Sequence, residues 1–218
     1  MDSTRFCVVV AAYNSMKWIK GTLDSISEQD YDHYTVCVVD DASTDEGQAD
    51  FIEAYCKSQG WEYILREKHV GAMGNQVAAI NRICLYDDDV IVIVDGDDRL
   101  ASYDVLSYLS HVYSKGTVDM TYGSYIPDPP SPTCPMPRAY PQEVVAAGNY
   151  RTWTRKHGII FNHLRTFKYG LFKQMDEDVD FKWPDGKWFE ACADTAIMIP
   201  ALELSGGRHR YISKKLYI

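Results

Sequence analysis

The sequence has no apolar run close to the roughly 20 residues that a membrane-spanning helix requires. It also has no excess of basic residues, because 22 lysines and arginines stand against 31 aspartates and glutamates, a net charge of −9. Such a chain repels phosphate backbones, so nucleic-acid binding is not expected. An anionic ligand would need a local source of positive charge, such as a metal ion or a helix N-terminus, to offset that repulsion.

Paired cysteines and the short motifs of several enzyme classes are missing as well. The six cysteines form no C-x-x-C pair, and Cys7, Cys37 and Cys84 lie in or beside apolar runs. This favours buried, reduced thiols and a cytoplasmic location. No signal-peptide pattern precedes the first apolar run. The absence of G-x-x-x-x-G-K-[ST] excludes a P-loop kinase or ATPase, and the absence of G-x-S-x-G leaves no obvious serine nucleophile.

Apolar runs alternate with segments of helical periodicity over the first hundred residues. The runs at 6–12, 34–39 and 90–94 are rich in valine and isoleucine and predict strands buried on both faces, with a shorter strand at 61–66. Helices are predicted at 16–28, 50–58 and 76–86. This alternation indicates an α/β fold with a doubly wound, mostly parallel sheet, whose ligands bind at the carboxyl ends of the strands.

The second half of the chain has weaker patterns. A strand is predicted at 121–126, a helix at 193–205 that starts at Asp194, and a final strand at 211–218. Because the chain stops at that strand, we expect a domain cut from a longer protein. The stretch 127–141 holds seven of the nine prolines and is either a solvated loop or a flap beside a binding cleft.

Two acidic clusters flank the run at 90–94. The first, 87–89, is predicted to be a solvated turn. The second contains Asp95, Asp97 and Asp98 and follows a buried strand directly, so its carboxylates are expected to converge at the edge of the sheet. Carboxylates that close repel one another, and a hard divalent ion such as Mn²⁺ or Mg²⁺ would stabilise them. A purely structural acidic turn is the alternative.

Polar residues also follow the other two long strands. Asp41 could accept a hydrogen bond from the imide N–H of a base or from a ribose hydroxyl. The alternative is helix capping by Asp41 or Ser43. Tyr13 could stack on a base or serve only in packing. If the sheet is parallel, all three loops lie at one edge of it.

The order and spacing of these segments resemble the inverting family-2 glycosyltransferases of the GT-A fold. Within that family the resemblance extends to the N-terminal domain of glycan-building enzymes of large viruses. It rests on five segments in the order of the family: FCVVVAAYN (6–14), CVVDDASTD (37–45), AAIN (78–81), VIVIVDGDD (90–98) and EACADTAIMIPALELSGG (190–207).

The resemblance implies a single GT-A domain over 1–218, with a nucleotide-sugar-binding half at 1–100 and a glycan-acceptor half at 101–218. The donor side it implies comprises Ala11, Tyr13, Asp41, Asn81 and Asp95. Asp97 would be the main ligand of Mn²⁺ or Mg²⁺, with Asp98 close by and Asp95 in the metal shell or on the ribose.

Asp194 matches the acid that the family uses as general base. The acid that normally precedes it is replaced by Ala193, and the arginine that often precedes the position matched by Asn81 is replaced by Ile80. Lys68, Arg82 or His163 could compensate for the missing arginine, and His157, His163 or His209 could add a metal contact. The alternative for Asp194 is a simple N-cap.

The implied reaction moves a sugar from a UDP- or dTDP-sugar to a hydroxyl of a glycan acceptor by one in-line displacement. Trp153, Trp183 and Trp188 are candidates for packing against the acceptor or for burial in the core. Two other functions stay open. One is a non-catalytic nucleotide-sugar-binding module, and the other is a sugar nucleotidyltransferase, which usually has a glycine-rich basic loop where this chain reads YNSMK (13–17).

Overall fold

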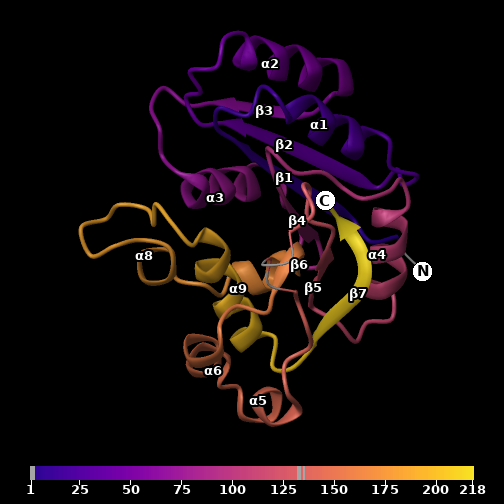
Figure 1. The fold of residues 1–218 in the computed structure, drawn as a ribbon, viewed down its shortest axis with the longest axis vertical. Helices are drawn as coiled ribbons and strands as arrows, with labels where there is room; N and C mark the ends of the chain where they lie inside the picture. The colour runs from indigo at the N-terminus through magenta and orange to yellow at the C-terminus, as the bar shows by residue number, and fades with distance from the viewer. Residues whose placement is uncertain (1–2, 132–133, 135) are drawn as a thin grey trace.

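The computed structural model describes residues 3–131, 134 and 136–218 (Figure 1). In this part of the chain, seven strands form one sheet in the order β3-β2-β1-β4-β6-β5-β7. The strands are β1 (Phe6–Ala12), β2 (Tyr34–Asp40), β3 (Glu62–Leu65), β4 (Val90–Asp95), β5 (Met120–Tyr125), β6 (Asn162–Lys168) and β7 (His209–Tyr217).

Helices cover both faces of the sheet. They are α1 (Ile19–Ser27), α2 (Gln48–Gln59), α3 (Ala72–Ile83), α4 (Val105–Tyr113), α5 (Gln142–Ala147), α6 (Tyr150–His157), α7 (Tyr169–Phe172), α8 (Glu177–Asp180) and α9 (Ala193–Leu204). Side chains alternate across β1, so Val8 and Val10 pack in the core cluster of α1, α2 and α4. Cys7 and Val9 pack in the cluster of α3 and α9 on the other face. The result is three layers, with the sheet in the middle.

The central strands are parallel, so their carboxyl ends meet at one edge. Ala12 of β1 pairs with Asp40 of β2, and Ala11 pairs with Asp95 of β4. The predicted α/β fold with a mostly parallel sheet is therefore confirmed, and the three polar loops lie at the same edge. Strand β6 is the exception to the parallel arrangement, because it runs antiparallel to β4 and to β5. This pairing places Arg165 opposite Ile93.

Predicted and observed elements agree best in the first half. The bounds of β1 are as predicted, and those of β2 and β4 extend the predicted strands by one acidic residue each. The predicted helix at 76–86 begins four residues earlier, at Ala72. The sequence did not predict α4, β6 or the short helices α5 to α8.

The acidic cluster before β4 differs from its prediction as a solvated turn. Asp89 is buried, with 2% of its side chain exposed, and forms an ion pair with Arg5 at 2.6 Å. Its carboxylate also accepts hydrogen bonds from the backbone N–H groups of Leu85 and Tyr86. Asp89 is therefore a buried side chain that stabilises the turn before β4, whereas Asp88 is exposed and pairs with Lys168.

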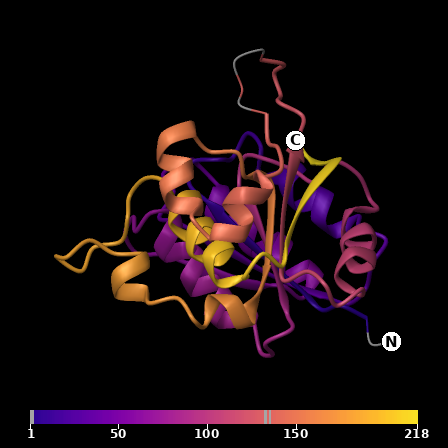
Figure 2. The same ribbon diagram turned by 90° about the horizontal axis from the view of Figure 1, so that it is seen from below.

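The described part of the proline-rich stretch extends away from the sheet near the end of β7 (Figure 2). Positions 132, 133 and 135 of that predicted loop lie outside the described residues. Within the described residues no helix is long and apolar enough to cross a membrane. Cys7, Cys37 and Cys84 are buried free thiols, as predicted, and burial raises the pKa of Cys37 to about 12.

Candidate active site

The acidic loop after β4 is held in place from two sides. The hydroxyl of Thr22 in α1 donates to the carbonyls of Gly96 and Asp98, at 3.1 and 2.6 Å. The backbone N–H of Asp95 donates to the hydroxyl of Tyr217 in β7, at 2.8 Å. Gly96 packs so closely on β1 that a Cβ atom there would lie 2.8 Å from the Cα of Ala12. The loop therefore has little freedom to move its carboxylates.

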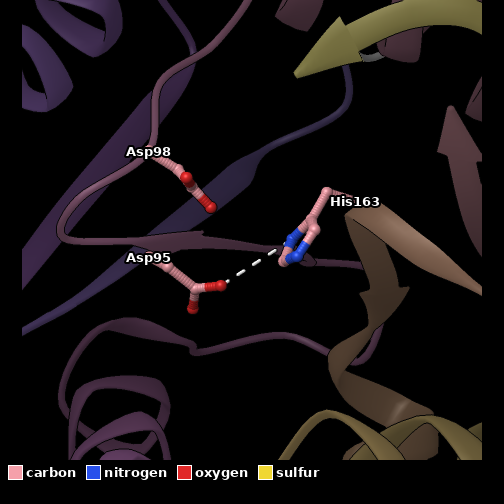
Figure 3. Close-up of side chains that lie close together, drawn as sticks. All are labelled: Asp95, Asp98 and His163. Carbon is pink, nitrogen blue, oxygen red and sulfur yellow. Dashed lines mark ion pairs between the residues drawn. The ribbon is translucent and has the colours of Figure 1, made fainter. Parts of the chain in front are cut away.

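Three side chains converge above this loop (Figure 3). Asp95, Asp98 and His163 each offer one ligand atom, and these atoms all lie within 4.8 Å of one another. Burial, together with the negative charges of Asp95 and Asp97, raises the pKa of Asp98 to about 6. A divalent ion bound here would add positive charge beside this carboxylate.

Arg165 of β6 is the buried cation of the site. Its Nη2 donates to Oδ2 of Asp95 at 2.6 Å and lies 3.1 Å from Nδ1 of His163. Burial opposes the charge on Asp95, but the guanidinium outweighs that effect and holds the pKa of this carboxyl below its ordinary value. Burial and the positive charge of Arg165 lower the pKa of His163 to about 3, so this imidazole is neutral at pH 7.

The chemistry of the three ligand groups fits Mn²⁺ or Mg²⁺. Two carboxylates and a neutral imidazole are ligands that Mn²⁺ accepts. His163 was only one of three histidines proposed for such a contact from the sequence. Asp97, which the resemblance implies as the main ligand, is exposed and is not part of this cluster.

A second part of the site lies at the ends of β1 and β2. A cavity of about 220 Å³ is lined by Ala11, Ala12, Tyr13, Asp41, His69, Gly71, Ala72, Asn75 and Glu190. Three residues that the resemblance implies for base binding, Ala11, Tyr13 and Asp41, therefore line one cavity. Asn81 does not line this cavity: it is exposed and lies nine residues after the start of α3. The buried Asn75, near the start of the same helix, does line the cavity.

Asp41 does not cap a helix. Its Oδ1 accepts a hydrogen bond from the N–H of Val70 at 2.7 Å, and its Oδ2 accepts one from the N–H of Gly71 at 2.8 Å. The N-cap of α2 is Gly47, and the carboxylate of Asp40 accepts the N–H of Ser43. Asp40 at the end of β2 and Asp41 just after it thus each stabilise a loop through backbone N–H groups.

Asp194 lies in the first turn of α9, after the N-cap Cys192. Its Oδ1 accepts the N–H of Thr195 at 2.7 Å, and its negative charge helps to keep Arg165 protonated against burial. Asp194 is therefore electrostatically coupled to the same guanidinium as Asp95. It is partly exposed, as a group that receives a proton from a bound hydroxyl must be.

The tryptophans divide between the core and the surface. Trp153 packs against Tyr140, and Trp188 packs over Gly74 of α3, so both contribute to the core. Trp183 is 56% exposed. A cavity of about 550 Å³ opens between α6 and α9 beside Thr195, the neighbour of Asp194, and its walls include Arg155 and Phe189.

This edge of the sheet combines a cavity the size of a nucleotide base with a cluster of cation ligands, the arrangement of a nucleotide-dependent transferase of the α/β class. The family model for glycosyl transferase family 2 matches residues 7–176, so the chain belongs to that family. The amylovoran biosynthesis glycosyltransferase AmsB of Erwinia amylovora is 30% identical over 101 residues, which cover 45% of this chain and 33% of that protein.

Solved structures share the fold over 98% of this chain. The S. aureus protein TarS (residues 1–349), in complex with UDP-GlcNAc, superposes with a TM-score of 0.67 at 19% identity. The mannosyltransferase PcManGT of Pyrobaculum calidifontis, in complex with GDP-Man and Mn²⁺, gives 0.63 at 19% identity. This chain covers 57% of residues 1–349 of TarS, 36% of a longer TarS chain and 55% of PcManGT, so it spans only part of the length of these proteins.

Proposed function

We propose that this glycosyltransferase moves a sugar from a UDP- or dTDP-sugar to a hydroxyl of a glycan acceptor, with inversion at the anomeric carbon. The observation that carries the proposal is the convergence of Asp95, Asp98 and His163 at the same sheet edge as the cavity of Tyr13 and Asp41. The UDP-GlcNAc and GDP-Man complexes of the two proteins of similar fold support a nucleotide-sugar donor.

We assign the nucleotide to the half formed by residues 1–100 and the glycan acceptor to the half formed by 101–218. Ala11, Tyr13 and Asp41 form the base end of the donor site, and Asn75 takes the place that the sequence suggested for Asn81. We place the enzyme in a reducing compartment such as the cytoplasm, where its free cysteines persist, and in the host cytoplasm if its origin is viral.

Asp95, Asp98 and His163 would hold Mn²⁺ or Mg²⁺. When bound, the ion offsets the negative charge that grows on the leaving nucleoside diphosphate. Arg165 keeps Asp95 ionised. Because Arg165 donates to Nδ1 of His163, the imidazole would bind the ion through this nitrogen only if the ion replaced that hydrogen bond.

Asp194 acts as the general base in this proposal. It takes the proton from the attacking hydroxyl of the glycan acceptor while that oxygen bonds to the anomeric carbon. The bond from the anomeric carbon to the phosphate oxygen breaks on the opposite side, and the nucleoside diphosphate leaves with the electron pair. Because Asp194 lies in the first turn of α9, the helix dipole stabilises its carboxylate before the proton arrives.

The metal site is tested by Mn²⁺ titration calorimetry on Asp98→Ala and Asp97→Ala. We expect Asp98→Ala to lose Mn²⁺ binding and the Mn²⁺-dependent binding of UDP. Asp97→Ala is the comparison variant from the same loop, because this exposed carboxylate is not part of the cluster. If Asp97→Ala lost the ion and Asp98→Ala kept it, the sequence-based choice of Asp97 would be right and the cluster with His163 wrong.

The catalytic assignment is tested by Asp194→Asn in a transfer assay and a donor-binding assay. The variant should bind UDP or dTDP with unchanged affinity and should lose transfer to a glycan acceptor and hydrolysis of the donor. Normal turnover by Asp194→Asn would remove this residue as the base. If the wild-type protein bound donor and neither transferred nor hydrolysed it, the alternative of a non-catalytic binding module would hold.

A further inference from the structure

The loop that closes the base end of the donor cavity is built around the carboxylate of Asp41. This side chain is 2% exposed, and each of its oxygens accepts a backbone N–H, from Val70 at 2.7 Å and from Gly71 at 2.8 Å. Gly71 has a φ of +94°, a conformation that L side chains rarely adopt, and this turn directs both N–H groups at the same carboxylate. Asp41 therefore fixes the position of the loop.

The same carboxylate also orients His69. Nδ1 of His69 lies 2.9 Å from Oδ2 of Asp41. Because a carboxylate offers lone pairs and no proton, this close approach favours a proton on Nδ1. The neutral ring then has a free lone pair on Nε2, and the hydrogen bond of one nitrogen determines the role of the other.

His69 lies next to the aromatic ring of Tyr13 inside the cavity. The two ring centroids are 4.3 Å apart and the rings are inclined by 45°. Tyr13 is 49% exposed, and His69 is 55% exposed in its side chain. Both rings line the cavity, so a base held there is bordered by both of them.

We propose that His69, rather than Asp41, reads the base of the donor, by accepting the ring N–H of the base at Nε2. Uracil and thymine carry such an N–H between two carbonyls, and guanine carries one beside a single carbonyl. Cytosine and adenine present a lone pair at the corresponding nitrogen, which faces the lone pair of Nε2 without a proton between them. Asp41 is then a positioning residue that sets the tautomer of His69. This inference rests on the proposed function of the cavity as a donor site.

The test compares the affinities of UDP and CDP at pH 8, in the presence of Mn²⁺, for the wild-type protein and His69→Phe. Phenylalanine keeps a flat ring beside Tyr13 and has no hydrogen-bond acceptor. We expect the wild type to prefer UDP, and His69→Phe to bind UDP about 3- to 10-fold more weakly, the loss expected for one hydrogen bond. The variant should also lose the preference over CDP. The matched control is Glu67→Gln, an exposed substitution in the same loop that should change neither affinity.

The outcomes separate the two proposals. A His69→Phe variant that keeps the wild-type ratio of UDP to CDP affinity overturns the role of His69 and leaves the donor site intact. A wild-type protein that binds no nucleoside diphosphate overturns the donor site itself, and the role of His69 with it. Asp41→Asn should weaken the preference for UDP as well, because an amide can donate to Nδ1 and so favour the other tautomer.

Discussion

Replacement of Arg165 by methionine tests how the site balances its charges. Methionine keeps most of the length of the side chain and removes the guanidinium that lies 2.6 Å from Asp95. Removal of one partner from a buried ion pair costs about 3–5 kcal/mol, because the other charge stays buried without compensation. Arg165 is 4% exposed but Asp95 is 33% exposed in its side chain, so we expect the lower end, about 3 kcal/mol.

A loss of that size is measurable by urea unfolding, and in a domain of this size it lowers the Tm by roughly 6–12 °C. Mn²⁺ should stabilise Arg165→Met more than it stabilises the wild type, because the ion restores a positive charge beside Asp95. The control is Arg208→Met, which breaks a more exposed pair with Asp119 and should change the unfolding much less than Arg165→Met does. If Arg165→Met unfolded at the urea concentration of the wild type, the guanidinium would not be the counter-ion that we infer.

Three further changes probe other parts of the fold. A hydrogen bond from Arg208 holds the pKa of Asp119 below its ordinary value, so the stabilisation is present above pH 3.8 and is lost as the pH falls below it. Asp119→Asn should therefore lower the Tm at pH 7, and calorimetry should show this difference shrinking as the pH falls below 3.8. Gly96→Ala forces a Cβ atom against the backbone of Ala12 and should cost about 1–3 kcal/mol in urea unfolding. Thr22→Val leaves two loop carbonyls without their hydroxyl donor and should reduce Mn²⁺ affinity in calorimetry, whereas equal affinity would show that the loop keeps its shape without that donor.

The sequence predicted those parts of the fold in which local pattern and burial agree. The runs that became β1, β2 and β4 are buried on both faces, so nearly every position is apolar and the pattern is strong. Helix α4 had a usable signal that was overlooked, since Val105, Leu109 and Val112 recur at helical spacing and are buried.

Strand β6 was not predicted from the sequence, and it carries the part of the site that the sequence did not reveal. Its run NHLRTFK mixes charged and apolar residues, because Arg165 and Thr166 are buried with polar partners. Arg165 can be buried because it pairs with the carboxylate of Asp95, 70 positions away in the chain. A local sequence pattern does not reveal such a distant pair. His163 and Arg165 reach Asp95 only because β6 inserts antiparallel between β4 and β5. Asp95, Asp98 and Asp41, by contrast, follow strands that the sequence did predict.

The hydrogen bond from the N–H of Asp95 to the hydroxyl of Tyr217 joins residues 122 positions apart. During synthesis, β1 to β4 can pair as soon as they leave the ribosome, but this contact must wait until β7 has emerged and paired with β5 at the edge of the sheet. Nascent chains that stall before β7 would therefore carry an assembled nucleotide cavity beside an unfinished cation cluster. Catalytic competence is, on this view, among the last properties that the folding chain acquires.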